Sequence, residues 1–155
     1  MASVGTLALP ESAREPAGLA IAFRERITEG RAEAVVQHLA AARAAAWTHG
    51  DQQRLRAAEV TGSPAYQRDS EDLRTAADQK VRYDGLKFTV RSAKVQQGSG
   101  EVVHVTAMID RSAYGVVTAK GRRTVPAAAG QQTDLSVQWT DSGWRVVDWA
   151  EASTS

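Results

Sequence analysis

The side chains best suited to move protons in the second half of this sequence are one histidine and two aspartates. His104 and Asp110 have the same parity along a predicted strand, so both would project from one face of it. A histidine facing a cavity can act as a general base, whereas on an outer face it is an ordinary surface residue. Asp148 has the same parity as Val146 in the last predicted strand. Among apolar neighbours, desolvation would raise the pKa of its carboxyl group; near the end of a strand, the same side chain reaches solvent. None of the three has an obvious partner, so they are candidate catalytic residues and no more.

Other kinds of catalytic and binding site lack their usual patterns. The chain contains no cysteine, which excludes disulfides, thiolate metal sites and a cysteine nucleophile. His38, His49 and His104 fall in different predicted elements, without the spacing of metal ligands. Residues 98–100 (Gly-Ser-Gly) form a predicted hairpin tip with no helix behind it, so they are not a phosphate-binding loop. We therefore expect neither a metal nor a cofactor.

Charge argues against a nucleic-acid partner. The formal net charge is +1; residues 1–84 carry 11 basic and 12 acidic side chains, and residues 85–155 carry 8 and 6. Neither half supplies the basic surface that binds phosphate backbones. The cluster of Lys120, Arg122 and Arg123 is predicted to be a solvated turn. No apolar stretch is long enough for a membrane span or a signal-peptide core, so we expect membrane contact only through an anchor outside this sequence.

The chain divides into a leader and one domain. Residues 1–18 are small and polar, with two prolines and no periodicity, which predicts a flexible leader. Residues 19–152 are predicted to form a single domain, because two pieces of this length would each be too small to bury a good core.

Helical periodicity dominates the first part of that domain. Apolar residues recur every three or four positions between 19 and 48 and predict a long helix with one apolar stripe: Val35, Val36, Leu39, Ala42, Ala46 and Trp47. Gly50 ends this helix and Asp51 caps a short helix over 51–59. Pro64 then opens a third helix that reaches about Lys80.

From Leu86 onward the apolar period becomes two, which is typical of strands. The predicted strands are 86–95, 102–109, 114–118 (or a continuation of the second), 133–139 and 144–149. Most have one polar face, which favours an antiparallel sheet covered on one side by helices. The predicted fold class is therefore α+β, with N-terminal helices packed on a curved antiparallel sheet of about four strands.

This order of elements, together with the turn and Gly-Trp-Arg-Val at 143–146, resembles the nuclear transport factor 2-like superfamily. The stretch 44–51 is similar to the end of the first helix in that family. The resemblance covers about residues 32–150 and implies a cone-shaped fold, in which a bent sheet wraps around the long first helix. These motifs are structural, so the resemblance indicates the fold and does not identify a reaction.

A narrower resemblance concerns the setting of the domain. Residues 62–73, followed by Gly85 and Leu86, are similar to one branch of actinobacterial proteins, and the excess of arginine over lysine, 15 to 4, is typical of a GC-rich genome. Proteins of that branch often carry this domain outside the membrane behind an N-terminal anchor. The resemblance thus implies an envelope- or membrane-associated protein, while the composition alone leaves the compartment open.

A non-enzymatic accessory or interaction domain is the function that these features favour. The open face of the sheet is mixed in polarity, which suits a wet interface with a protein partner or with a second copy in a homodimer. Arg91 and Gln138 are predicted to lie near that contact.

The alternative comes from the family resemblance. Some members of the superfamily are isomerases, cyclases or dehydratases that place polar residues inside the cone. On that hypothesis the domain is a small enzyme or carrier for an apolar molecule, with His104, Asp110 or Asp148 transferring protons. A cone cavity of about 300 Å³ or more would favour it.

Overall fold

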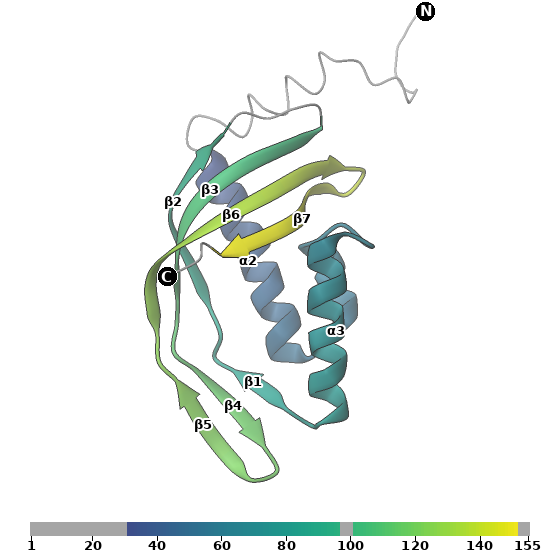
Figure 1. Cartoon of the computed structure of the whole chain (residues 1–155), viewed down its shortest axis with the longest axis vertical. Helices are drawn as coiled ribbons and strands as arrows, with labels where there is room; N and C mark the ends of the chain where they lie inside the picture. Colours follow the sequence, from purple (N-terminus) through teal and green to yellow (C-terminus); the bar gives the residue numbers. More distant parts are fainter. Residues whose placement is uncertain (1–30, 97–100, 152–155) are drawn as a thin grey trace, which may run out of the picture.

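The computed structural model describes residues 31–96 and 101–151, which form helices packed against antiparallel strands (Figure 1). The α+β class and the cone-like arrangement are confirmed. The predicted leader at 1–18, the first part of the first helix and the hairpin tip at 97–100 lie outside the described residues.

Three helical segments precede the strands in the described residues. They are α2 (Arg31–His49), the 3₁₀ helix η1 (Gln52–Ala57) and α3 (Pro64–Asp78). Asp51 caps η1, because its carboxylate accepts a hydrogen bond from the N–H of Gln53 at 2.9 Å. Ser63 caps α3 in the same way through the N–H of Tyr66. No helix among the described residues is long and apolar enough to cross a membrane.

The strands form two antiparallel sheets. They are β1 (Arg82–Asp84), β2 (Phe88–Val95), β3 (Val102–Arg111), β4 (Tyr114–Thr118), β5 (Gly121–Val125), β6 (Ala128–Thr140) and β7 (Gly143–Glu151). The larger sheet has the order β2-β3-β6-β7, and the smaller has the order β1-β4-β5. Figure 1 shows the larger sheet curving around α2, with the β4–β5 hairpin extending beyond one end.

The main core lies between α2 and the inner face of the larger sheet. Val36 and Leu39 of α2 are fully buried against an apolar set from the strands: Val103, Val105, Ala107, Ile109, Leu135, Val137, Val146 and Trp149. The predicted apolar stripe is confirmed at Val36, Leu39 and Ala46, whereas Val35 and Ala42 are only half-buried. The alternation of β3 is confirmed in full, because every second residue from Val103 to Ile109 is buried.

The pattern of apolar residues does not predict two of the strands. Strands β1 and β5 are short and largely exposed, so they carry no alternation of apolar and polar residues. Arg122 and Arg123 were predicted within a turn; that prediction is wrong, because both lie in β5, and Arg122 reaches across to the carboxylate of Asp84 at 2.6 Å. The larger sheet still has the four strands that the sequence predicts.

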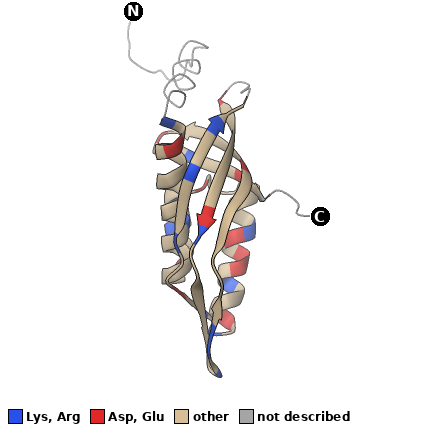
Figure 2. Cartoon of the chain, turned by 90° about the vertical axis from the view of Figure 1, so that its left-hand side faces the viewer, with Lys and Arg blue, Asp and Glu red and all other residues tan. Residues whose placement is uncertain are grey.

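Both edges of the larger sheet are partly covered, whereas no described element covers its outer face. On β7, the N–H and C=O of Val146 pair with backbone groups of Ala58 and Val60. On β2, the side-chain amide of Gln37 donates to the carbonyl of Phe88 and accepts from the N–H of Val90, both at 2.9 Å. Figure 2 views the outer face, where the strands lie in front of the helices and carry only scattered charges.

Candidate functional site

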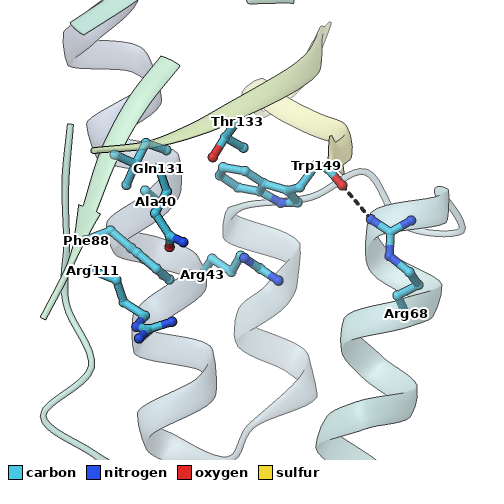
Figure 3. A pocket seen from close by; sticks show the side chains of 9 residues that line it. Ala40, Arg43, Arg68, Phe88, Arg111, Gln131, Thr133 and Trp149 are labelled. Carbon is cyan, nitrogen blue, oxygen red and sulfur yellow. Dashed lines mark hydrogen bonds between the residues drawn. The ribbon is translucent and has the colours of Figure 1, made fainter. Parts of the chain in front are cut away.

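A cavity lies inside the cone, between α2, α3 and the inner face of the larger sheet. Its volume is about 220 Å³. Figure 3 shows its lining residues: Ala40, Arg43, Arg68, Phe88, Ile109, Arg111, Gln131, Thr133 and Trp149. Apolar and aromatic groups make part of the wall, and three arginines supply its cationic groups.

A second cavity of about 190 Å³ adjoins the first, since Arg43, Phe88 and Arg111 line both. Its other walls are largely aromatic: Trp47, Tyr83, Leu86 and Tyr114. Trp47 and Tyr83 meet edge to face, with ring centroids 5.1 Å apart. Burial raises the pKa of the Tyr83 phenol above its usual value, so this hydroxyl stays protonated at neutral pH.

Arg43 belongs to a buried polar network beside the first cavity. It forms a two-pronged ion pair with Asp69 of α3, at 2.7 and 2.9 Å, and its guanidinium lies 5.2 Å from the ring centroid of Trp149. Glu59 completes the network, because its Oε2 accepts a hydrogen bond from the indole N–H of Trp149 at 3.0 Å. The side chain of Glu59 is fully buried.

The two acids of this network are held in opposite protonation states. Burial, together with the neighbouring Asp69, raises the pKa of Glu59 to about 9. Burial alone would also raise the pKa of Asp69, but hydrogen bonds from Arg43 and Glu59 outweigh it and hold that pKa below its usual value. Oε1 of Glu59 has no donor beside it, which fits a protonated acid that donates to Asp69. The network therefore has one cation, one anion and one neutral acid at pH 7.

The other two cavity arginines differ in their partners. Arg68 of α3 donates to the carboxylate of Asp148 at 2.9 Å and to the carbonyl of Trp149 at 2.8 Å. Arg111 of β3 donates to the carbonyl of Pro126 at 2.8 Å and lies over the ring of Tyr114. Its Nε is buried and has no hydrogen-bond partner.

The structure places the three predicted candidates outside this cavity. His104 is exposed on the outer face, where its Nδ1 lies 3.1 Å from the hydroxyl of Ser136. Asp110 also lies on the outer face, with Arg91 on one oxygen and the N–H of Gly130 on the other. Those two partners hold the pKa of Asp110 below its usual value. The two residues share a face, as their parity predicts, but no hydrogen bond joins them.

Asp148 does not share a face with Val146, contrary to the predicted parity. A β-bulge places Val147 as an extra residue opposite β6, so Val146 pairs with Val137 while Asp148 pairs with Ser136. Trp149, and not Asp148, consequently turns into the core. The carboxylate of Asp148 remains 42% exposed and pairs with Arg68.

The predicted contact residues lie at opposite ends of the outer face. Arg91 occupies a bulge of β2 beside Asp110, whereas Gln138 pairs with Val102 and Arg145 near the other end. Seven residues of β3 separate these positions, which corresponds to roughly 24 Å. A contact that includes both must span the sheet.

The residues that line the cavity were not among the sequence candidates. Arg111 continues the inward parity of Ile109, but the predicted strand stops at 109. Arg43 lies on a helix among alanines, and Glu59 is the last residue of the short helix predicted over 51–59, where the apolar pattern does not mark it as buried. Among the described residues, no group of three or more His, Cys, Asp and Glu side chains is placed to hold a metal ion.

Comparison with known proteins gives structural neighbours only. No family model matches the sequence, and no curated protein is significantly similar to it. The crystal structure of the intermembrane space region of the chloroplast protein ARC6 is similar, with a TM-score of 0.64 and 18% identity over 79% of this chain and 95% of that one. A protein described as a candidate aromatic ring hydroxylase from Novosphingobium aromaticivorans has a TM-score of 0.54 and 13% identity, over 79% and 89% of the two chains. Aln2 from a Streptomyces species has a TM-score of 0.52 and 12% identity, over 79% and 90%.

The arrangement is the cone-like fold that the resemblance to the nuclear transport factor 2-like superfamily implies: helices are enclosed by a bent antiparallel sheet, with the long helix α2 inside the curve. At identities below one fifth, the neighbours establish the fold alone.

Proposed function

We propose that this chain is a non-enzymatic interaction domain that associates with a second copy of itself through the outer face of the β2-β3-β6-β7 sheet. The observation that carries the proposal is the contrast between the partly covered edges and the open face. Edge strands are the usual route for one sheet to pair with another. Here Gln37 occupies the edge of β2 at Phe88 and Val90, and residues 58–60 occupy the edge of β7 at Val146, which leaves the face as the larger open surface.

The chemistry of this face suits a wet, reversible contact. Its middle carries hydrogen-bonded polar pairs, such as Thr106 with Asp134, beside the half-buried apolar side chain of Met108. Lys94 on β2 and Asp134 on β6 give it charges of both signs, so a second copy can offer complementary groups. A mixed face of this kind favours a self-complementary two-fold contact.

The size of the face sets the expected strength. Four strands and a length that reaches from Arg91 to Gln138 give a face of roughly 20 by 25 Å. Such a contact would bury on the order of 1,000 Å² in total, which is the lower end for specific interfaces. We therefore expect a concentration-dependent homodimer, with Arg91 and Gln138 at the two ends of the contact.

The side chains that line the two cavities favour binding of a small ligand over catalysis. The described residues around the larger cavity include arginines, a threonine and a glutamine, none of which exchanges protons near neutral pH. Tyr83 in the smaller cavity stays protonated. The larger cavity, at about 220 Å³, adjoins the smaller one of about 190 Å³, and the two together have room for a small ligand.

We further propose that the domain belongs to an envelope- or membrane-associated actinobacterial protein, acting on the extracytoplasmic face. The motifs at 62–73 and at 85–86 support this setting. Two experiments test this setting: sequencing of the native gene with its neighbours, and fractionation of the host cells. Recovery of the protein in the cytosolic fraction alone would contradict the proposed setting.

Sedimentation equilibrium over a wide concentration range tests the association. Met108→Lys places a charge in the middle of the outer face without touching the core, so we expect it to shift the monomer–dimer equilibrium toward monomer by about tenfold or more, since a like-charged pair opposes itself across a two-fold contact. Lys120→Glu, at the exposed tip of the β4–β5 hairpin, is the matched control and should associate as the wild type does. A wild-type protein that stays monomeric at millimolar concentration, or a dimer indifferent to Met108→Lys, would overturn the proposal.

A further inference from the structure

The outer edge of strand β5 has no neighbouring strand among the described residues. The smaller sheet has the order β1-β4-β5, so β5 pairs with β4 on one side only. Figure 1 shows β5 on the outside of its hairpin, away from the helices. The two edges of the larger sheet differ from this one, because Gln37 and residues 58–60 partly occupy them. The edge of β5 can therefore accept an added strand.

The geometry of the β4–β5 hairpin determines which backbone groups of β5 are free. The hairpin closes at the pair Thr118 and Gly121 across a two-residue loop, so these residues exchange their backbone hydrogen bonds. Hydrogen-bonded pairs then recur at every second position, and Arg123 belongs to one of them. The N–H and C=O groups of Arg122 and Thr124 consequently point away from β4. No hydrogen bond from another described residue reaches these groups.

The side chains of the hairpin make this edge cationic. Residues 114–125 include three basic side chains and no acidic one. The charge of Arg122 is neutralised within the sheet, because its guanidinium lies over Gly115 and donates to the carboxylate of Asp84 at 2.6 Å. Arg123 is exposed, and none of the ion pairs among the described residues includes it. The edge thus has an uncommitted guanidinium at its middle.

This charge opposes pairing of β5 with a second copy of itself. Arg123 is the middle residue of β5, so in-register antiparallel pairing of two copies would place their Arg123 side chains directly opposite each other. Like charges in that arrangement are destabilising. On the free side of β5, Arg123 occupies a non-hydrogen-bonded position, where opposing side chains come closest. An acidic residue in the added strand forms a cross-strand ion pair there.

We propose that the edge of β5 is a docking site for an extended acidic peptide segment of a partner protein, which adds to β5 as an antiparallel strand. The free backbone groups of Arg122 and Thr124 bond to the peptide backbone, and Arg123 pairs with the acidic side chain opposite. In strand addition, main-chain hydrogen bonds supply the affinity and side chains supply the specificity. The proposed self-association uses the outer face of the larger sheet, so the two proposals stand or fall separately.

Fluorescence anisotropy with a set of labelled peptides tests this docking site. The first peptide alternates valine and glutamate, and the second has glutamine in place of glutamate. The last is the acidic peptide with its valine nitrogens methylated, because the valine N–H groups face β5 when a glutamate faces Arg123.

The acidic peptide should bind more tightly than either of the others. We expect about a fivefold difference from the glutamine peptide, the upper range for a cross-strand ion pair. The methylated peptide keeps the charge but loses hydrogen bonds to β5, and should bind about tenfold more weakly or worse. Equal affinity of the acidic and glutamine peptides, equal affinity of the acidic and methylated peptides, or no saturable binding of the acidic peptide would each overturn the proposal.

Variants locate the site on β5. Arg123→Glu should bind the acidic peptide more weakly than the glutamine peptide; an unchanged preference would overturn the assignment. Thr124→Pro removes one outward N–H at a position where an edge strand tolerates proline, and should weaken the acidic peptide several-fold. No loss in that variant would contradict strand addition. Arg74→Glu, on the exposed side of α3, is the matched control and should bind as the wild type does.

Two further measurements keep the test decisive. Circular dichroism establishes folding, and should Arg123→Glu fail to fold, Arg123→Gln decides: loss of the preference for the acidic peptide supports the site, and a retained preference overturns it. In amide NMR of the wild type, the acidic peptide should shift the signals of Arg122 and Thr124. Met108→Lys should bind this peptide as the wild type does, which separates the test from that of the dimer; shifts confined to the outer face, or a loss of binding in Met108→Lys, would overturn the proposal.

Discussion

At the scale of single residues, the protonation states of Glu59 and Asp69 connect the buried network to measurable stability. Glu59 keeps its proton in the folded domain up to a pKa of about 9, but loses it near its ordinary value of 4.5 when the chain unfolds. Between these values the folded state binds one more proton than the unfolded state, so stability should fall as the pH rises. Asp69 acts in the opposite direction, because its pKa is depressed in the folded state and its contribution is lost as the pH falls through the acid range.

Urea denaturation from about pH 5 to about pH 9 measures the contribution of Glu59. The free energy of unfolding should decrease with pH, by at most about 1.4 kcal/mol per pH unit for one proton. Glu59→Gln should flatten this dependence, because the amide accepts from Trp149 and donates to Asp69 without titrating. Glu71→Gln, on the exposed side of α3, is the control and should keep the wild-type slope. A Glu59→Gln variant with the wild-type slope would show that Glu59 is not the titrating group.

The residue scale is also where the sequence was least informative. Alternation along a strand gives the correct face for His104, but an extra residue at Val147 reverses the parity of Asp148 and Trp149. A bulge of this kind leaves no mark in the pattern of apolar residues. Glu59 and Asp69 were equally hard to find, because their burial depends on helices that meet only in the folded domain.

At the scale of secondary structure, Gln37 is a helix residue that behaves as part of a sheet. Its amide makes the two hydrogen bonds that a neighbouring strand would offer to Phe88 and Val90. Gln37→Ala should lower the free energy of unfolding by about 1–3 kcal/mol, since two half-buried backbone groups lose their partner. His38→Ala, on the exposed side of the same helix, controls for helix propensity and should have little effect. Equal stability of both variants in chemical denaturation would contradict this role.

The elements themselves follow from sequence to different degrees. A clear apolar period is found in the elements that pack one side on the core: helix α2, the two later helical segments and strands β2, β3, β6 and β7. The exposed strand β5 and the first residues of β6, such as Ala128 and Gly130, have no such constraint. At Gly130 a positive φ of 63° marks a register shift against β3, where the carboxylate of Asp110 binds its N–H.

At the scale of the whole molecule, the two faces of the larger sheet differ in character. The inner face of the larger sheet, with α2, encloses a cationic cavity, while the outer face is open and mixed in polarity. The fold class and its resemblance to the nuclear transport factor 2-like superfamily could be predicted from sequence. The contents of the cone could not, because they depend on side chains that approach one another from α2, α3 and the sheet.

The most direct test of the central claim, association through the outer face, is a dilution series followed by two-dimensional amide NMR. On dilution, the amide signals of β2, β3, β6 and β7 around Met108 and Asp134 should shift together, with one dissociation constant. The signals of α3 and of the β4–β5 hairpin should stay fixed. Spectra that do not change with concentration, or shifts confined to the hairpin or to α3, would contradict the account.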